Sequence, residues 1–440
     1  MSKSRMNIIV LLFLFIQLYH SFEQVVGIDL GNMYFVSTLV QQGKPFVVVE
    51  NLQSKRKTHS SVTLQVPRKF GVDAYKMSFT KPEIALSHFL PLLGLNYQEA
   101  HIYLQVNHLN YKIIENFRKG VSFINPEGIE YSIEEAVAML LYHAKSLADK
   151  FAHRNVSEYV FTIPLGFKPA QKIALLNAAK ISGLEVTSFI SENVAASLKL
   201  QLDSLVQNST QNILYINIGA SSTKFSIIQH SHLFYNGSKI SNESVSLLAE
   251  EYDNSLSGRL IDISFANLLA SKVDKIRLKQ NSKATLIKNN TIAFSKAIQY
   301  AKKYKESILG LQNVKIDLPN LIDSRDYRID VTYEEFETSI IPVLSNIPII
   351  LKRLTNKGFN IDNAQLIGGI VRIPKVQSIL KESLPNIKIN QNLDGDESIS
   401  FGASFFIANK SNSFKVKKIL LYDGIHEEIR IEIKPLICIN

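Results

Sequence analysis

The sequence predicts an α/β protein built from two related halves. Two distant segments, Val25–Val40 and Ile213–Ile228, share one pattern: an apolar run, then Asp or Asn, an apolar residue and Gly, then a second apolar run. This pattern is typical of a strand, a tight turn and a returning strand. Helical patterns follow each segment, so strands and helices alternate in both halves. We therefore expect two α/β lobes, with one hairpin from each facing a shared cleft.

The two hairpins correspond residue by residue. Superimposing them places Asp29 on Asn217 and Gly31 on Gly219. The two glycines give their turns backbone freedom and allow a ligand to approach closely. Glycine turns are common in hairpins, however, so each turn alone is also explained by a purely structural role. Asp29, for example, could serve only to stabilise its own turn.

Helices are expected over four segments: Tyr131–Phe151, Pro169–Ser182, most of Asp253–Gly310, and Pro342–Lys357. Ser132 is a suitable N-cap for the first, because acidic residues follow it. Proline opens the second, and Gly183 lies just past its end. The fourth is expected to end at Gly358.

A third glycine site lies in Leu366–Leu380. An apolar run leads into Gly368-Gly369, and Pro374 then opens a helical pattern. Paired glycines allow backbone to approach a nucleotide, and helix N-termini favour phosphate. A double-glycine turn is often only a turn, but three such sites in one chain favour nucleotide binding.

The N-terminus predicts secretion. Lys3 and Arg5 precede an apolar run from Met6 to Leu18, which is shorter than the ~20 residues of a membrane span. We expect a signal peptide removed near Ser21 and no membrane attachment afterwards; an uncleaved anchor or a buried first strand is the alternative. Six Asn-X-Ser/Thr sequons would become relevant in a secretory compartment: Asn155, Asn208, Asn236, Asn242, Asn289 and Asn409.

Composition excludes two classes of site. The net charge is +10, but the lysines are scattered and form no basic stripe interleaved with aromatic residues, so we expect no nucleic-acid partner. The single cysteine, Cys438, excludes an intramolecular disulfide framework and a cysteine-based metal cluster.

Several motifs in one order carry a family resemblance. From about Gln24 to Lys410 the chain resembles the actin-like ATPase domain of heat-shock-seventy chaperones. The matching segments are Asp29–Gly31, Thr162–Pro164, Ile190–Asn193 before Ala195-Ala196, Asn217–Thr223, Ile367–Pro374, and Asp396-Glu397 before Phe401–Ala403. The resemblance implies an actin-like ATPase fold with two duplicated lobes around a nucleotide cleft.

Within that superfamily the chain looks most similar to the large glucose-regulated members of the ER lumen. Lys55–Thr58 and Ser413–Lys418 resemble segments of those proteins. The implied organisation is a signal peptide at 1–21, lobe I at 22–210, lobe II at 211–410, and a short tail at 411–440. We expect the family's peptide-binding half to be absent.

The resemblance also implies site residues. Those expected to bind ATP or ADP are Asp29, Gly31, Asn32, Asn217, Gly219, Ser221, Ser222, Lys305, Gly368, Gly369 and Asp396. Asp29 would face Mg²⁺ through water. Glu192 matches a carboxylate near the attacking water, and capping of a helix is its structural alternative. A catalytic lysine is expected near Lys76, although ungapped spacing places Tyr75 there.

Departures from the family pattern bear on catalysis. Asn217 stands where the family has a second metal-facing aspartate, and an amide adds no charge to offset a cation. The family's second phosphate loop has consecutive glycines, and Ala220, Ser221 and Ser222 restrict the backbone of this loop. Loss of the metal-facing carboxylate and loss of the catalytic lysine would each cost about 10² in rate. We expect weak Mg²⁺ binding and slow or absent hydrolysis.

Three functions remain open. The first is an ATP-binding chaperone or co-chaperone of the ER lumen that assists protein folding. Nucleotide exchange on a luminal heat-shock-seventy chaperone is one form of this role, and unfolded clients are a further class of partner. The second is a non-catalytic binding module. The third is an actin-fold sugar kinase, which would need a catalytic Asp and a sugar pocket that the sequence does not locate.

Overall fold

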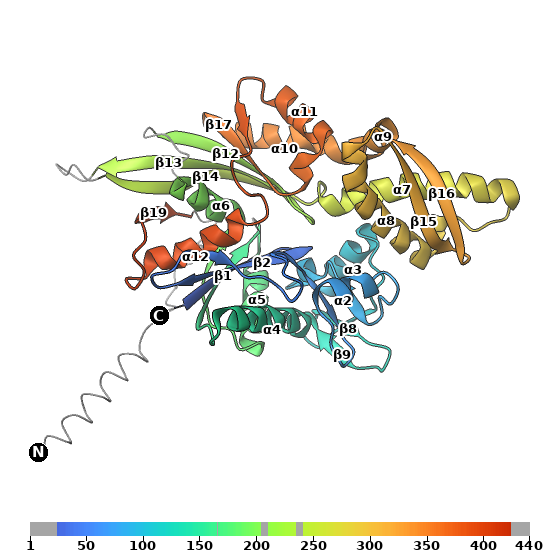
Figure 1. Cartoon of the computed structure of the whole chain (residues 1–440), viewed down its shortest axis with the longest axis horizontal. Helices are drawn as coiled ribbons and strands as arrows, with labels where there is room; N and C mark the ends of the chain where they lie inside the picture. The colour runs from blue at the N-terminus through green and yellow to red at the C-terminus, as the bar shows by residue number, and fades with distance from the viewer. Residues whose placement is uncertain (1–23, 165, 204–209, 235–240, 424–440) are drawn as a thin grey trace, which may run out of the picture.

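The computed structural model describes residues 24–164, 166–203, 210–234 and 241–423 (Figure 1). The expected signal peptide lies outside these residues, as do Cys438 and the sequons at Asn208 and Asn236. In the described part of the chain, no helix is long and apolar enough to cross a membrane.

Lobe I is organised around a sheet that begins with the first predicted hairpin. Its strands are β1 (Gln24–Leu30), β2 (Tyr34–Gln41), β3 (Val47–Val48), β10 (Glu158–Ile163) and β11 (Val186–Ser191), in the order β11-β10-β1-β2-β3, with β4 (Thr58–His59) also paired to β2. β1 runs antiparallel to β2 and parallel to β10, and β10 runs parallel to β11.

Lobe II repeats this arrangement. Its strands are β12 (Gln211–Ile218), β13 (Thr223–Phe234), β14 (Ser241–Asp253), β17 (Asn363–Ile367), β18 (Lys388–Asn390) and β19 (Ile419–Tyr422), in the order β18-β17-β12-β13-β14-β19. β12 is antiparallel to β13 and parallel to β17, and β17 is parallel to β18. The predicted duplication and both hairpins are therefore confirmed by the strand pairing.

The helices are α2 (Gly71–Met77), α3 (Tyr97–Val106), α4 (Ile133–Ala152), α5 (Pro169–Ile181), α6 (Glu192–Leu202), α7 (Gly258–Gln280), α8 (Thr291–Gly310), α9 (Tyr333–Leu344), α10 (Asn346–Thr355), α11 (Pro374–Ser383) and α12 (Ser398–Lys410). The first three helix predictions are confirmed. Ser132 Oγ accepts from the Glu135 N–H as the N-cap of α4, and Gly183 follows α5 at φ +73°.

The fourth helix prediction is wrong in its start. Pro342 lies in the last turn of α9, and α10 begins only at Asn346. The true start signal is Thr332, whose side chain accepts from the Glu335 N–H in a capping box. Proline cannot donate to the preceding turn, and α9 ends two residues after it.

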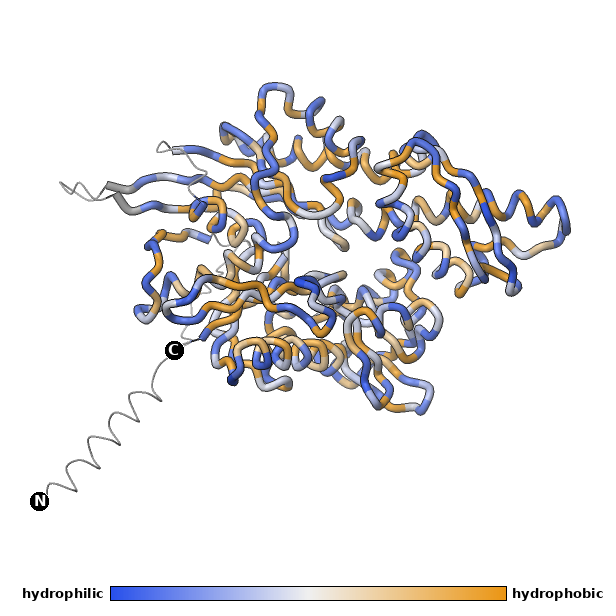
Figure 2. The backbone as a smooth tube through the Cα atoms, viewed as in Figure 1, coloured by the Kyte–Doolittle hydropathy of each residue, from blue (hydrophilic) through white to orange (hydrophobic). Residues whose placement is uncertain are grey.

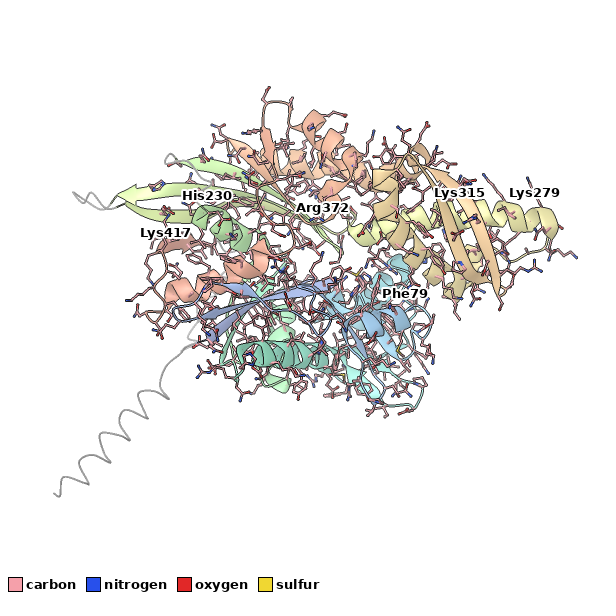
Figure 3. All side chains as sticks on the ribbon, viewed as in Figure 1. Phe79, His230, Lys279, Lys315, Arg372 and Lys417 are labelled. Carbon is pink, nitrogen blue, oxygen red and sulfur yellow. The ribbon has the colours of Figure 1, made fainter. Side chains whose placement is uncertain are left out.

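Smaller elements extend both lobes. Lobe I carries β5 (Ser61–Thr63) with β6 (Ala85–Ser87), η1 (Leu90–Leu92), and a three-stranded sheet of β7 (Ile113–Glu115), β8 (Val121–Ile124) and β9 (Glu130–Ser132). Lobe II carries η2 (Ile287–Asn289), η3 (Ile370–Arg372), and the hairpin of β15 (Asn313–Ile322) and β16 (Arg325–Thr332), which lies with α7, α8 and α9 at one end of the molecule (Figure 1). Lys279 and Lys315 lie on this outlying part, whereas Arg372 lies between the lobes (Figure 3).

A layer formed by α6 and α12 lies between the two sheets. One hydrophobic cluster includes Val25 of β1, Ile213 of β12, and residues of both helices. Along the strands and helices of both lobes, hydrophobic residues alternate with hydrophilic ones (Figure 2). Period-2 alternation sends the next β1 residue, Val26, into a second cluster with α4 and α5. Both main sheets are thus anchored to one shared helical layer.

The packing of α12 crosses the linear boundaries expected for the lobes. Although α12 belongs to the segment expected to form lobe II, it contacts the lobe I sheet: the Gly27 N–H donates to Ser404 Oγ (2.9 Å), and Ser404 Oγ donates to the Thr38 carbonyl (2.6 Å). In the expected tail, β19 pairs in parallel with β14. Just past β19, Asp423 accepts from Ser191 Oγ (3.0 Å).

The contact between α6 and α12 has no room for a larger residue. A Cβ added at Gly402 would lie 1.8 Å from the Ala195 carbonyl oxygen, so the helices would have to separate. We predict that Gly402→Ala lowers the free energy of unfolding by about 1–3 kcal/mol, as overpacking does in other cores. Gly310→Ala is the matched control, because a Cβ at Gly310 has no neighbour within 4 Å. Urea unfolding of both variants checks this, and a wild-type midpoint for Gly402→Ala would contradict it.

Candidate functional site

A cavity of about 220 Å³ lies where the two hairpin turns face each other. Both lobes contribute to its lining. Of the residues expected at the site, those that line it are Asp29, Gly31, Asn32, Glu192, Asn217, Gly219, Ser221, Ser222, Gly368 and Asp396. The structure thus gathers segments that are far apart in sequence into one site, as the repeat predicts.

Asp29 lies at the end of β1 and faces the cavity. Its Oδ1 accepts a hydrogen bond from Thr162 Oγ1 at 3.0 Å. Burial, and next the negative charge of Glu192, raise the pKa of Asp29 to about 7, although Thr162 and Lys224 act in the opposite direction. The Asp29 carboxyl therefore exchanges its proton near neutral pH.

Two glycines are required by the backbone of the site. A Cβ at Gly31 would lie 2.5 Å from the Tyr34 carbonyl oxygen. Gly368 has φ +87°, and a Cβ there would lie 2.7 Å from the Ile218 carbonyl oxygen. Gly31 thus lets the first hairpin turn close on itself, and Gly368 lets the end of β17 lie against the end of β12.

Glu192, Asn217 and Lys224 form one buried cluster. Glu192 is the first residue of α6, and its Oε2 accepts from Lys224 Nζ (2.7 Å) and from Asn217 Nδ2 (3.0 Å). The side chains of Glu192 and Lys224 are 13% and 8% exposed, so this ion pair is largely shielded from water. A carboxylate held by two donors is poorly placed to accept a proton from water.

Two buried polar residues, Asn32 and Ser222, also line the cavity. Asn32 is buried and donates through Nδ2 to the Tyr103 hydroxyl (3.2 Å). Its Oδ1 has no hydrogen-bond partner among the described residues. Ser222 is also buried and lines the cavity. A buried acceptor without a partner is costly, so Asn32 Oδ1 lowers the stability of this part of the cavity wall.

Ion pairs between the lobes close one side of the cavity. Lys57 Nζ lies 2.8 Å from Asp396 Oδ2, and Arg56 lies 3.0 Å from Glu397. The segment Lys55–Thr58, singled out in the sequence, therefore contacts lobe II. Asp396 lines the cavity but is already paired with Lys57.

Lys76 and Lys305 do not reach the cavity. Lys76 is exposed on α2, while its neighbour Tyr75 is buried, as the ungapped spacing implies. Lys305 forms an ion pair with Asp262. Gly369 does not line the cavity, and a Cβ at this position would have no neighbour within 4 Å.

Sequence reasoning missed two lysines, Lys224 and Lys302. Lys302 extends from α8 to lobe I, where its Nζ lies 3.0 Å from the Tyr75 hydroxyl and 5.2 Å from the centre of the Tyr34 ring. Burial lowers the pKa of Lys302 to about 8. The register of the second hairpin could have revealed Lys224, because Lys224 is the cross-strand neighbour of Asn217. Lys302 carries no comparable local signal.

The residues present do not fit a conventional Mg²⁺ site. Among the described residues, no group of three or more His, Cys, Asp or Glu side chains could hold a metal ion. Of the two carboxylates nearest the hairpin turns, Glu192 is paired with Lys224, and burial keeps part of Asp29 protonated at neutral pH. The glycine turns, by contrast, leave room for close approach of a polar ligand of nucleotide type.

The duplicated sheets, the shared helical layer and the cavity between the hairpins define an actin-like ATPase fold. Comparison with protein families makes the assignment specific: the model described as Hsp70 protein matches residues 25–435, so the chain belongs to the Hsp70 family. The predicted family and fold class are confirmed.

Three relatives show how much of the family's architecture the chain covers. It is 27% identical to hypoxia up-regulated protein 1 of Mus musculus over 418 residues, which is 93% of this chain and 41% of that protein. The chain is also 27% identical to the human protein of the same name over 417 residues, which is 93% of this chain and 41% of that protein. It is 27% identical to the Xenopus tropicalis protein over 417 residues, which is 93% of this chain and 64% of that protein. The chain therefore spans about two fifths to two thirds of these relatives.

The raised pKa of Asp29 predicts a pH-dependent stability. The folded protein holds this proton up to about pH 7, whereas the unfolded chain releases it near 3.8, so its contribution to stability is lost as pH rises between these values. Asp29→Asn lacks this titration. We predict that the free energy of unfolding of Asp29→Asn, relative to that of the wild type, rises across this window by a few kcal/mol at most. This difference should stay constant above about pH 7.

Urea unfolding from pH 4 to pH 8 measures this difference. Glu127→Gln, which changes an exposed carboxylate, is the control and should follow the wild type at each pH. A pH-independent difference between Asp29→Asn and the wild type would show that Asp29 titrates normally.

Proposed function

We propose that this chain is an ATP- or ADP-binding co-chaperone of the ER lumen with weak or absent hydrolysis. The observation that carries the proposal is the meeting of three glycine-containing turns, from both lobes, around one cavity with an unsatisfied buried acceptor. Backbone that can approach closely suits phosphate, because its N–H groups can donate to the phosphate oxygens. Mg²⁺ contributes only weakly in this proposal.

Weak hydrolysis follows from the occupied polar groups. Phosphoryl transfer depends on positioning and on charge stabilisation in the transition state. Glu192 is held by Lys224 and Asn217, and Tyr75 rather than Lys76 is turned into the protein. Among the described residues, Glu192 is therefore not free to act as a base, and Lys76 does not line the cavity. A non-catalytic binding module is therefore the second candidate function.

The proposed partner is a luminal Hsp70 chaperone whose nucleotide this protein helps to exchange. Membership of the Hsp70 family and similarity to hypoxia up-regulated protein 1 support a place in chaperone function. An exchange role needs a defined arrangement of the lobes more than it needs turnover. Nucleotide and partner would then tighten each other's binding by the same factor. Unfolded clients are a further class of partner.

The luminal location is proposed from the N-terminal sequence and the sequons. Asn155 and Asn289 are exposed and accessible to glycan transfer. Asn409, by contrast, donates through Nδ2 to the Ile419 carbonyl (2.6 Å), so a glycan there would break the connection to β19. Recovery of an intact N-terminus on a cytosolic, unglycosylated protein would contradict this location.

Nucleotide binding is tested at Gly219. A Cβ at this position would lie 3.3 Å from the Ser222 carbonyl oxygen and 3.5 Å from Lys224 Nζ, so it would occupy space at the second turn with little strain elsewhere. We predict that Gly219→Ala weakens ADP binding about tenfold or more, which corresponds to about 1.4 kcal/mol. Isothermal titration measures this, with Gly310→Ala as control. Phosphate release from ATP should stay near the blank; brisk turnover would refute the proposed mechanism.

The exchange role is tested directly. A luminal Hsp70 chaperone loaded with labelled ADP is mixed with this protein, and release of the label is followed. We predict acceleration at micromolar concentration and a complex detectable by sedimentation. If neither effect appears and the protein still unfolds cooperatively, the exchange role is excluded and the non-catalytic binding module remains.

A further inference from the structure

Lys224 is a buried cation that the expected function does not require. It lies on β13 and lines the cavity. Its side chain is 8% exposed, and its ammonium lies 2.7 Å from Glu192 Oε2. The same ammonium is 3.5 Å from the position that a Cβ on Gly219 would take, so it lies directly beside the second turn.

The duplicated fold shows that a lysine is not needed here for structure. Lys224 is the cross-strand neighbour of Asn217, and the equivalent pair in lobe I is Val36 with Asp29. Val36 also lines the cavity. A short apolar side chain therefore satisfies the same register position in the other half of the molecule. Placing a lysine in a buried position costs desolvation energy that a valine does not.

Four of the five charged residues that line the cavity pair with one another. Its charged lining residues are Asp29, Lys57, Glu192, Lys224 and Asp396. Lys57 pairs with Asp396 and Lys224 pairs with Glu192, which leaves only Asp29. A divalent cation here would face one carboxylate and a nearby ammonium, whereas such ions prefer several oxygen ligands.

The ammonium retains the capacity to bind an anion. A lysine ammonium has three N–H donors. Among the described residues, Lys224 donates one hydrogen bond, to Glu192. Two donors remain beside a turn whose glycine permits close approach, and a lysine acts on phosphate as a point charge. Asn32 lines the same cavity, and its Oδ1 has no hydrogen-bond partner among the described residues.

We propose that Lys224 takes the place of the divalent cation, so that this cavity binds the phosphates of a nucleoside diphosphate without magnesium. The proposal rests on the proposed nucleotide-binding function and assigns its charge chemistry to one residue of the chain. In this arrangement Glu192 orients the ammonium, and Asn217 Nδ2 supports Glu192 from the other side.

The test compares ADP and pyrophosphate binding by isothermal titration, each with Mg²⁺ and with EDTA. Lys224→Val installs the residue type found at the equivalent position of lobe I. Because that variant leaves Glu192 buried and unpaired, the double variant Glu192→Gln/Lys224→Val removes both charges and separates loss of the cation from repulsion by Glu192. Lys145→Met, which removes an ion pair with Asp149 on α4, is the control.

We expect the ADP affinity of the wild type and of Lys145→Met to differ by less than about twofold between Mg²⁺ and EDTA. In EDTA, the double variant should bind ADP at least about tenfold more weakly than the wild type does. ADP binding that requires Mg²⁺, with the double variant equal to the wild type, would overturn the role of Lys224 and leave the proposed function standing. If pyrophosphate binding depends on Lys224 but ADP binds no more tightly than pyrophosphate, the anion site would stand and nucleotide binding would be overturned. Binding of neither ligand would overturn both.

Discussion

The close contact of α6 with α12 determines where the parts of the site lie. It depends on Gly402, because any Cβ there would collide with the Ala195 carbonyl oxygen. The first residue of α6 is Glu192, and the turn before α12 carries Asp396. Both carboxylates line the cavity. The same two helices join the two main sheets through one hydrophobic cluster, so the packing that unites the lobes also positions the acidic residues between them.

Within that frame, the polar groups of the cavity are matched mainly to one another. Glu192 is paired with Lys224, Asp396 with Lys57, and burial keeps part of Asp29 protonated near neutral pH. Breaking a buried pair by removing one partner is costly, because the other charge is left uncompensated. The two paired carboxylates are thus held in fixed charge states, and Asp29 is the cavity carboxyl whose protonation changes near neutral pH.

The sequence was sufficient for the parts of the fold that depend on local patterns. The two hairpins, the cap at Ser132 and the glycine past α5 each have a short-range signal, and each is found in the structure. Pro342 misled because proline is tolerated near the end of a helix as well as at its start. Lys302 could not be found from sequence, since it acts on Tyr34 and Tyr75 from a different lobe. Gly31 and Gly368 were found because glycine at a turn is conspicuous, whereas the ion pair of Lys224 depends on which strand lies opposite Asn217.

The bond between Gly27 and Ser404 joins residues 377 positions apart, which has a consequence for synthesis on the ribosome. At about 5–20 residues per second, the chain needs roughly 20–75 s to extend from one to the other. During that time the face of β1 that carries Val25 has no α12 to cover it, because α12 is among the last elements to be made. The N-terminal lobe therefore emerges with an apolar surface that the nascent chain cannot yet bury, and this face stays exposed to water until α12 has been made.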